Sequence, residues 1–186
     1  LRVLLKDIAE IQTGVFAKPN VDGDVVCLQA NDFDESGNHL GFWTPTISGD
    51  NLHSKHFLQQ GDVLFAAKGN KNFAAVRNNS LPLAVASTSF FVLRIHKQNL
   101  MPEYVKWFLN QPDTIQRLKS EAKGTSIPSI SKKSLEKIEI PSIPLDKQNL
   151  ILKIDHLRIS QKELLQKIAS LRDQLIQQQL NKAVHL

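Results

Sequence analysis

Apolar residues in the first half of the chain form short runs that Gly, Pro, Asn and Asp separate, and this pattern predicts β-strands. The runs are rich in Val, Phe, Thr and Ile, which favour strands, and they occupy residues 25–30, 62–68, 73–77 and 83–95. Residues 4–13 are predicted to form a helical turn that leads into a further strand, which ends at Gly14. Residues 31–38 contain the Asn, Asp, Ser and Gly residues of a turn.

After Pro102 the apolar residues recur at helical spacing. Pro102 itself indicates a helix start, because Pro is favoured at the first position of a helix. A helix over residues 102–111 places four apolar side chains on one face, namely Tyr104, Val105, Phe108 and Leu109. A second helix is predicted over residues 113–123, with Asp113 as its N-cap and with Ile115 and Leu118 pointing inward.

A loop and a short strand are predicted after these helices. The loop covers residues 124–131, and Ser131 or Ser134 caps a short helical turn. Residues 136–144 alternate between apolar and polar positions and end in two prolines, which is typical of an edge strand.

The last part of the chain predicts one long helix, because residues 146–182 contain neither Pro nor Gly and Asp146 is a favourable N-cap. Its apolar side chains recur at heptad spacing, at Leu150, Ile154, Leu157, Leu164, Ile168, Leu171 and Leu175, and Gln161 and Gln178 complete the seam. At ~1.5 Å per residue this helix is about 55 Å long. We expect the seam to pack on a partner helix in a coiled coil; the alternative is a helix that folds back on its own domain over part of its length.

These elements predict an α+β protein with a mixed sheet. Residues 1–145 form a globular domain and residues 146–186 form the long helix. No apolar run is long enough to span a bilayer and no export signal is present, so we expect a cytoplasmic protein. The single cysteine, Cys27, lies in an apolar run and is predicted to be a core residue rather than a nucleophile or a metal ligand.

The net charge of +5 is unevenly distributed. Residues 1–50 carry 3 Lys and Arg against 8 Asp and Glu, whereas residues 51–139 carry 13 against 6. A basic middle section suits a face that binds a polyanion such as DNA, and a random distribution of surface charge is the alternative.

Two groups of polar residues in the basic section are candidates for DNA contacts. The first group follows the second strand-like run and comprises Lys68, Asn70, Lys71, Asn72, Arg77 and Asn78. Amide side chains can bond adenine in the major groove, and cations can bond phosphates or guanine. The second group surrounds the loop at residues 124–131 and comprises Lys119, Lys123, Thr125, Ser126, Lys132 and Lys133. Ordinary surface loops carry similar residues, and Thr125 and Ser126 also suit a role in shaping the loop.

Patterns that imitate catalytic sites are weak. Asp113, Glu121 and Lys123 have the spacing of a PD-(D/E)xK nuclease, but their segment predicts a helix rather than the adjacent strands that such a site needs. His53 and His56 lack a third metal ligand at matching spacing. No glycine-rich cofactor loop is visible. A small endonuclease and a coiled-coil interaction protein without direct DNA readout stay as alternative functions.

Three blocks of the sequence resemble the specificity subunits of type I restriction-modification systems. They are residues 5–11 with Thr13-Gly14, residues 61–65 (GDVLF), and residues 124–131 (GTSIPSIS) followed by Leu135, Ile138, Ile140-Pro141, Pro144-Leu145 and Gln148. The loop after the second block (AAKGNKNFAAVR) differs from the commoner Gly-Thr form of the family. The resemblance spans essentially the whole chain.

This resemblance implies a DNA target recognition domain followed by a conserved spacer helix, without catalytic residues or a bound cofactor. Specificity subunits assemble with methyltransferase subunits, which use S-adenosylmethionine to methylate adenine, and with restriction subunits, which use ATP and Mg²⁺. Members of the family usually carry two recognition domains and two spacer helices. Because one of each is present here, the resemblance implies either a half-size subunit that forms a homodimer through its helix or a part of a longer subunit. The helix residues expected at that interface are Ile154, Leu157, Leu164, Ile168, Leu171 and Leu175.

Overall fold

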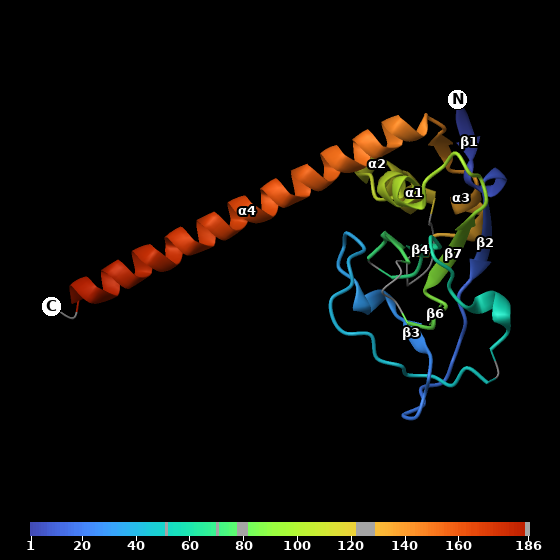
Figure 1. Ribbon diagram of the computed structural model, residues 1–186, viewed down its shortest axis with the longest axis horizontal. Coiled ribbons are helices and arrows are strands. Elements are labelled where there is room, and N and C mark those ends of the chain that lie inside the picture. Colours follow the sequence, from blue (N-terminus) through green and yellow to red (C-terminus); the bar gives the residue numbers. More distant parts are fainter. Residues whose placement is uncertain (51, 70, 78–81, 122–128, 185–186) are drawn as a thin grey trace. The chain divides into compact units, whose positions relative to one another are not determined.

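A computed structural model describes residues 1–50, 52–69, 71–77, 82–121 and 129–184 (Figure 1). It consists of two compact units, Leu1–Leu145 and Asp146–Leu186. Five DNA-contact candidates lie outside the described residues, namely Asn70, Asn78, Lys123, Thr125 and Ser126.

The globular unit is built on a four-stranded sheet in which all neighbouring strands are antiparallel. The strands, in sheet order, are β2 (Ala9–Thr13), β7 (Phe90–Ile95), β4 (Val63–Ala66) and β5 (Ala74–Val76). The central strand β4 is buried at all four positions, which explains its continuous apolar sequence. The strand-like run at residues 83–95 forms two strands rather than one, because a turn at Ser87 separates β7 from β6 (Ala84–Ala86).

Two further strand pairs join segments that are distant in the sequence. Strand β3 (Val26–Leu28) pairs with β6 in parallel, and β1 (Arg2–Leu4) pairs with β8 (Glu139–Pro141) in antiparallel orientation. Parallel and antiparallel pairs therefore coexist with helices, and the predicted α+β fold is confirmed. The two kinds of pairing lie in separate sheets rather than in one mixed sheet.

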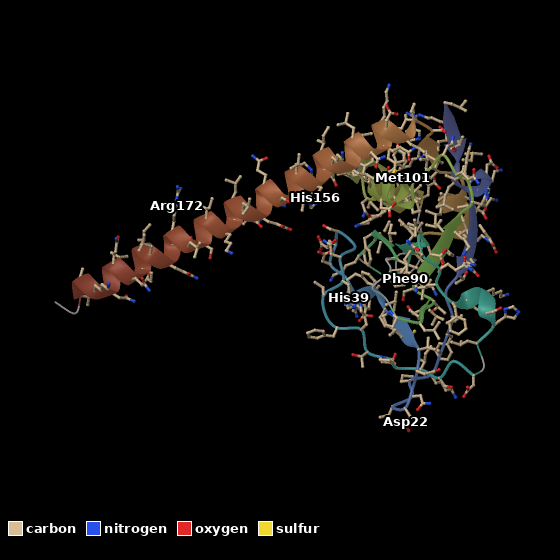
Figure 2. All side chains as sticks on the ribbon, viewed as in Figure 1. Asp22, His39, Phe90, Met101, His156 and Arg172 are labelled. Carbon is tan, nitrogen blue, oxygen red and sulfur yellow. The ribbon has the colours of Figure 1, made fainter. Side chains whose placement is uncertain are left out.

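Three phenylalanines hold the main sheet and the β3–β6 pair together. The ring centroids of Phe33, Phe73 and Phe90 lie 5.5–6.0 Å from one another, in edge-on and tilted contacts that favour aromatic packing. All three are almost fully buried, and apolar residues of the main sheet and of the β3–β6 pair surround them. Phe90 is labelled near β7 in Figure 2.

The helices of the globular unit agree with the sequence prediction, with small shifts at their ends. Helix α1 (Pro102–Leu109) buries Tyr104, Val105 and Leu109, and Phe108 is half-buried. Helix α2 (Pro112–Glu121) begins at Pro112, so Asp113 lies in its first turn and is not its N-cap. Pro is well suited to this first position because it has no N–H to leave unbonded. Ser131 caps α3 (Lys132–Glu136) by accepting a hydrogen bond from the Ser134 N–H at 3.0 Å.

The Gly61-Asp62 pair shapes the approach to β4. Gly61 has φ +81°, a conformation that glycine adopts without strain. The Asp62 carboxylate is 1% exposed, and it accepts hydrogen bonds from the Gln59 N–H at 2.8 Å and from the Arg94 guanidinium at 2.8 and 3.0 Å. This ion pair raises the pKa of Arg94. The second sequence block therefore has a structural role at the start of the central strand.

Helix α4 (Leu145–Val184) is 40 residues long. It begins one residue earlier than predicted, so Asp146 lies within its first turn rather than at its cap. Side chains extend from it along its whole described length, as Figure 2 shows around His156 and Arg172. The six predicted interface residues are 45–67% exposed, so the coiled coil stays a prediction. In the described part of the chain, no helix combines the length and the apolar composition needed to cross a membrane.

Candidate nucleic-acid interface

The first predicted group of DNA-contact residues begins in the connection between β4 and β5. The backbone N–H of Ala66 donates to the Phe73 carbonyl at 2.8 Å, and this bond closes the loop between them. The Asn72 amide nitrogen donates to the Ala66 carbonyl at 3.0 Å. Lys68 and Lys71 are exposed on this connection, residues 67–73, which is called the lysine loop below. The hairpin of β4 and β5 therefore presents two cations, and Asn72 helps to hold the backbone of the loop.

The second predicted group is tied to the first by backbone contacts. The Ile130 N–H donates to the Ala67 carbonyl at 2.8 Å, and Ser129 forms an isolated antiparallel bridge with Lys68. Ile130 is 2% exposed and anchors this contact in the core. The structure thus places the segment that precedes α3 directly beside the lysine loop, although the two are about sixty residues apart in sequence.

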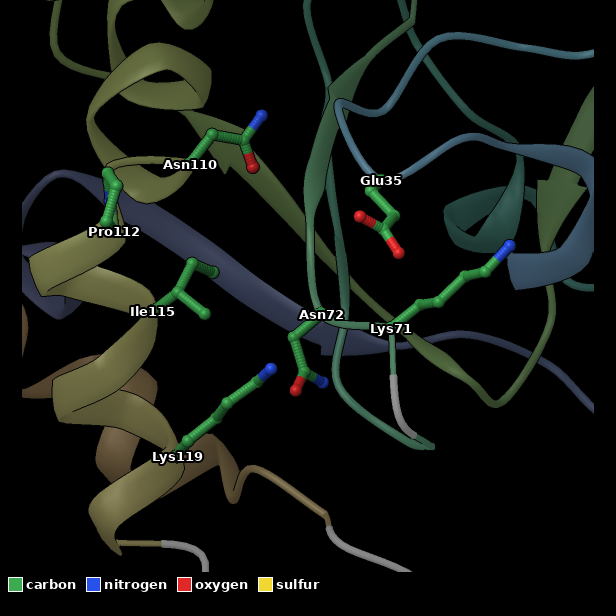
Figure 3. A pocket seen from close by; sticks show the side chains of 7 residues that line it. All are labelled: Glu35, Lys71, Asn72, Asn110, Pro112, Ile115 and Lys119. Atoms are coloured by element: carbon green, nitrogen blue, oxygen red, sulfur yellow. The ribbon is translucent and has the colours of Figure 1, made fainter.

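A pocket of about 270 Å³ lies between the lysine loop and α2 (Figure 3). Its lining residues are Glu35, Lys71, Asn72, Asn110, Pro112, Ile115 and Lys119. Lys71 and Asn72 come from the loop, Lys119 comes from α2, and Glu35 comes from the turn after Phe33. Lys119 and Lys71 are exposed and reach the same pocket from different elements, so the pocket combines cations from both predicted groups.

Asn110 connects α1, β5 and the turn that carries Glu35. Its Oδ1 accepts from the Ala74 N–H at 2.7 Å, and its Nδ2 donates to the Ala74 carbonyl at 2.9 Å and to the Ser36 carbonyl at 3.4 Å. The side chain therefore bonds β5 as a neighbouring strand would, while its backbone ends α1. Sequence reasoning missed Asn110 and Glu35. The position of Asn110 between two helices was a usable signal for a helix cap, whereas Glu35 looked like an ordinary turn residue.

The remaining predicted candidates lie apart from the pocket. Arg77 follows the far end of β5, where its N–H donates to the Asp62 carbonyl and its carbonyl accepts from the Gly61 N–H. Five residues of extended chain from Asn72 cover about 16 Å, so Arg77 lies at the opposite end of β5 from the lysine loop, and its contact with DNA stays a prediction. Lys132 and Lys133 are exposed on α3, and Lys132 forms an ion pair with Glu136 at 3.8 Å.

The residues whose sequence pattern imitates a catalytic or metal site do not form such a site in the described part of the chain. Asp113 and Glu121 both lie on α2, eight positions or about 12 Å apart, and cannot hold one metal ion together. The His53 Nδ1 accepts a hydrogen bond from the Lys55 N–H at the start of a short helical turn. Within the described ranges, no three His, Cys, Asp or Glu side chains form a group suited to metal binding. Cys27 is buried beside Val25, Ile47 and Val85, and burial, with a smaller effect of Asp32, raises its pKa.

The sequence of this chain matches a known protein family. Residues 2–179 match the model of the type I restriction modification DNA specificity domain. The chain belongs to this family. The specificity-subunit resemblance of the three sequence blocks is therefore confirmed, and specificity subunits of this family are in general non-catalytic. No curated protein sequence matches the chain.

Solved structures share the fold of this specificity domain. A chain from a structure on complex assembly and conformational transition of the type I R-M system has TM-score 0.64 and 20% identity, covering 88% of this chain and 39% of that one. The HsdS subunit from Thermoanaerobacter tengcongensis has TM-score 0.64 and 19% identity, covering 90% and 39%. The type I S subunit from M. genitalium has TM-score 0.56 and 14% identity, covering 83% and 37%. The chain thus spans less than two fifths of the length of these three proteins.

Proposed function

We propose that this chain reads a DNA sequence and directs adenine methylation and restriction by partner subunits of a type I complex. The observation that carries the proposal is the pocket that Lys71 and Lys119 both line, in a chain that matches a DNA specificity domain over residues 2–179. Two lysines from separate elements can bond phosphates on either side of a groove and orient the unit on the duplex. Lys68, which is tied to Ser129, extends the same basic surface.

In this proposal the partner subunits carry out adenine methylation and restriction. The methyltransferase subunit binds S-adenosylmethionine, and the restriction subunit binds ATP and Mg²⁺, while this chain supplies recognition in the cytoplasm. Asp113 and Glu121 do not converge, so the endonuclease alternative has no support from the described side chains. Turnover of S-adenosylmethionine or cleavage of DNA by the purified chain alone would contradict a non-catalytic role.

Assembly is assigned to α4, whose seam residues are exposed. A second copy of this chain supplies a matching seam, and an antiparallel pair of helices about a two-fold axis gives a homodimer. A second apolar stripe in the same helix contains Leu165, Ile176 and Leu180, which are 54–58% exposed. At 100° per residue it lies roughly 110° around the helix from the seam, so it offers a separate surface to the methyltransferase subunit.

The DNA-binding proposal is tested with Lys71→Ala and Lys119→Ala in one chain and a mixed-sequence duplex as probe. The affinity should fall, and the slope of log K against log salt should become shallower by roughly one unit for each phosphate that the protein no longer neutralises. Lys6→Ala with Lys18→Ala is the matched control, because both are exposed lysines outside the pocket lining. Equal affinities for both double variants at several salt concentrations would place the DNA interface elsewhere.

A further inference from the structure

Glu35 is an acidic residue on the surface that the proposed function assigns to DNA. It is exposed, and it lines the pocket together with Lys71 and Lys119. Among the described residues, the structure records no ion pair or hydrogen bond for its carboxylate. A carboxylate at this place repels phosphates, so it weakens DNA binding in general. It favours binding only where it accepts a hydrogen bond from the DNA.

The other side chains of the pocket have a defined donor and acceptor pattern. The Asn72 nitrogen is used by the Ala66 carbonyl, which leaves its Oδ1 as an acceptor. Asn110 uses both ends of its amide on Ala74 and Ser36. The pocket therefore presents two acceptors, Glu35 and the Asn72 oxygen, beside the ammonium donors of Lys71 and Lys119 (Figure 3).

The turn that carries Glu35 is held in place from several sides. The Asp34 Oδ1 accepts from the N–H groups of Ser36 and Asn38, both at 2.8 Å. Gly37 packs so closely on β5 that an added Cβ would lie 2.1 Å from the Ala74 carbonyl oxygen. Because Asn110 also bonds Ser36, the backbone of Glu35 is positioned before DNA arrives, and the turn gives up less backbone entropy on binding.

From this arrangement we infer that Glu35 determines base specificity by accepting a hydrogen bond from an exocyclic amino group in the major groove. That amino group is N4 of cytosine or N6 of adenine. At the same position guanine O6 and thymine O4 are acceptors, and they would face the carboxylate without a proton between them. Glu35 thus favours an amino-bearing base and disfavours the others, while Lys71 and Lys119 hold the neighbouring phosphates or a guanine. This inference rests on the proposed function.

The experiment selects duplexes from a library of randomised sequence with the purified chain, alone and with its methyltransferase partner. The unchanged chain is compared with Glu35→Ala, which removes the acceptor, with Glu35→Gln, which removes only the charge, and with Glu103→Gln, an exposed control on α1 outside the pocket lining. Glu35→Ala should alter the preferred motif at one base pair, with about 5- to 100-fold less discrimination there. Its affinity for unrelated duplexes should be equal or higher, because a repulsive charge is removed. Whether the altered position held cytosine or adenine identifies the amino group.

The possible results separate the DNA function from the role of Glu35. A motif that Glu35→Ala and the unchanged chain share at every position would overturn the role of Glu35 and leave the DNA function intact. A library from which the unchanged chain enriches no motif, alone or with its partner, would overturn the proposed function and this inference together. A change of motif with Glu103→Gln equal to that with Glu35→Ala would also contradict the assignment, since it would show a general effect of charge.

Discussion

Arg94 and Asp62 form an ion pair with two hydrogen bonds, from the guanidinium Nε and Nη2 to the two carboxylate oxygens, at 3.0 and 2.8 Å. The Asp62 side chain is 1% exposed and the Arg94 side chain is 23% exposed. Arg94 Nη2 also donates to the Phe57 carbonyl at 3.2 Å, so one guanidinium joins β7, the start of β4 and the segment before it. The pair stabilises the two central strands at the start of β4, the end of that strand opposite to the lysine loop.

Replacing Asp62 with Asn should therefore destabilise the globular unit by about 3–5 kcal/mol, because the Arg94 charge stays largely buried without its counter-charge. Urea unfolding measures this change. Glu139→Gln is the matched control, since it breaks an exposed ion pair with Arg2 at 3.7 Å and should cost less than about 1 kcal/mol. Equal midpoints for the two variants would show that the buried pair adds nothing to stability.

Gly14→Ala should destabilise the fold by about 1–3 kcal/mol. A Cβ at this position would lie 2.0 Å from the Ser87 carbonyl oxygen, so the chain and its neighbour must separate. Gly41→Ala is the control, because no atom lies within 4 Å of its added Cβ. Thermal unfolding should show a lower Tm for the first variant and a nearly unchanged one for the second. Retention of the original Tm by Gly14→Ala would disprove the close approach.

Ile168→Glu with Leu171→Glu should convert the proposed dimer into monomers and leave the globular unit folded. Each seam side chain is worth about 1.5–3 kcal/mol when fully buried, and two charges there would have to be desolvated. Sedimentation at tens of micromolar measures the mass, and circular dichroism checks folding. Gln166→Glu with Gln177→Glu is the control, because it adds the same charge away from the seam. A monomeric unchanged chain would refute the dimer.

A symmetric dimer also predicts the form of the DNA target. Two copies of one recognition unit, related by a two-fold axis, should read the same half-site in opposite orientations, separated by bases that are not read. Mapping methylated adenines in cells with and without this chain tests the prediction. A non-palindromic motif would argue against the symmetric arrangement, even if the chain determines the motif.

The Cys27 thiol should lower the stability of the fold at alkaline pH. Burial raises its pKa in the folded state, so the unfolded chain loses the thiol proton first and gains stability as pH rises through about 8.5. The free energy of unfolding should therefore be at its full value below that pH and decline above it. Denaturant titrations between pH 7 and about 9.5 measure the decline, and Cys27→Ala should reduce it. An identical decline in the variant would assign the effect to other groups.

Local patterns in the sequence predicted most elements, but they did not predict which strands are neighbours. Val26–Leu28 and Ala84–Ala86 each have the apolar composition of a buried strand, and nothing in either run specifies a parallel partner. The site shows the same limit. Lys71 and Lys119 were predicted in separate groups, and only the packing of α1 and α2 on the sheet brings them to one pocket. Arg77 is close to the lysines in sequence but lies at the other end of β5, and Glu35 was missed because its turn looked purely structural.

The pairing of β1 with β8 has a consequence for how the protein is made. Val3 lies opposite Ile140, 137 positions further along the chain, so β1 cannot complete its pairing until almost the whole globular unit has been translated. At a translation rate of 5–20 residues per second, β1 remains unpaired on the ribosome for roughly 7–30 s. Contacts of such long range are also slow to form, because the entropy of closing a large loop is lost before the bonds that offset it can form. Nascent chains stalled before Ile140 should remain open to proteolysis near Arg2–Leu4, and chains released beyond it should become protected.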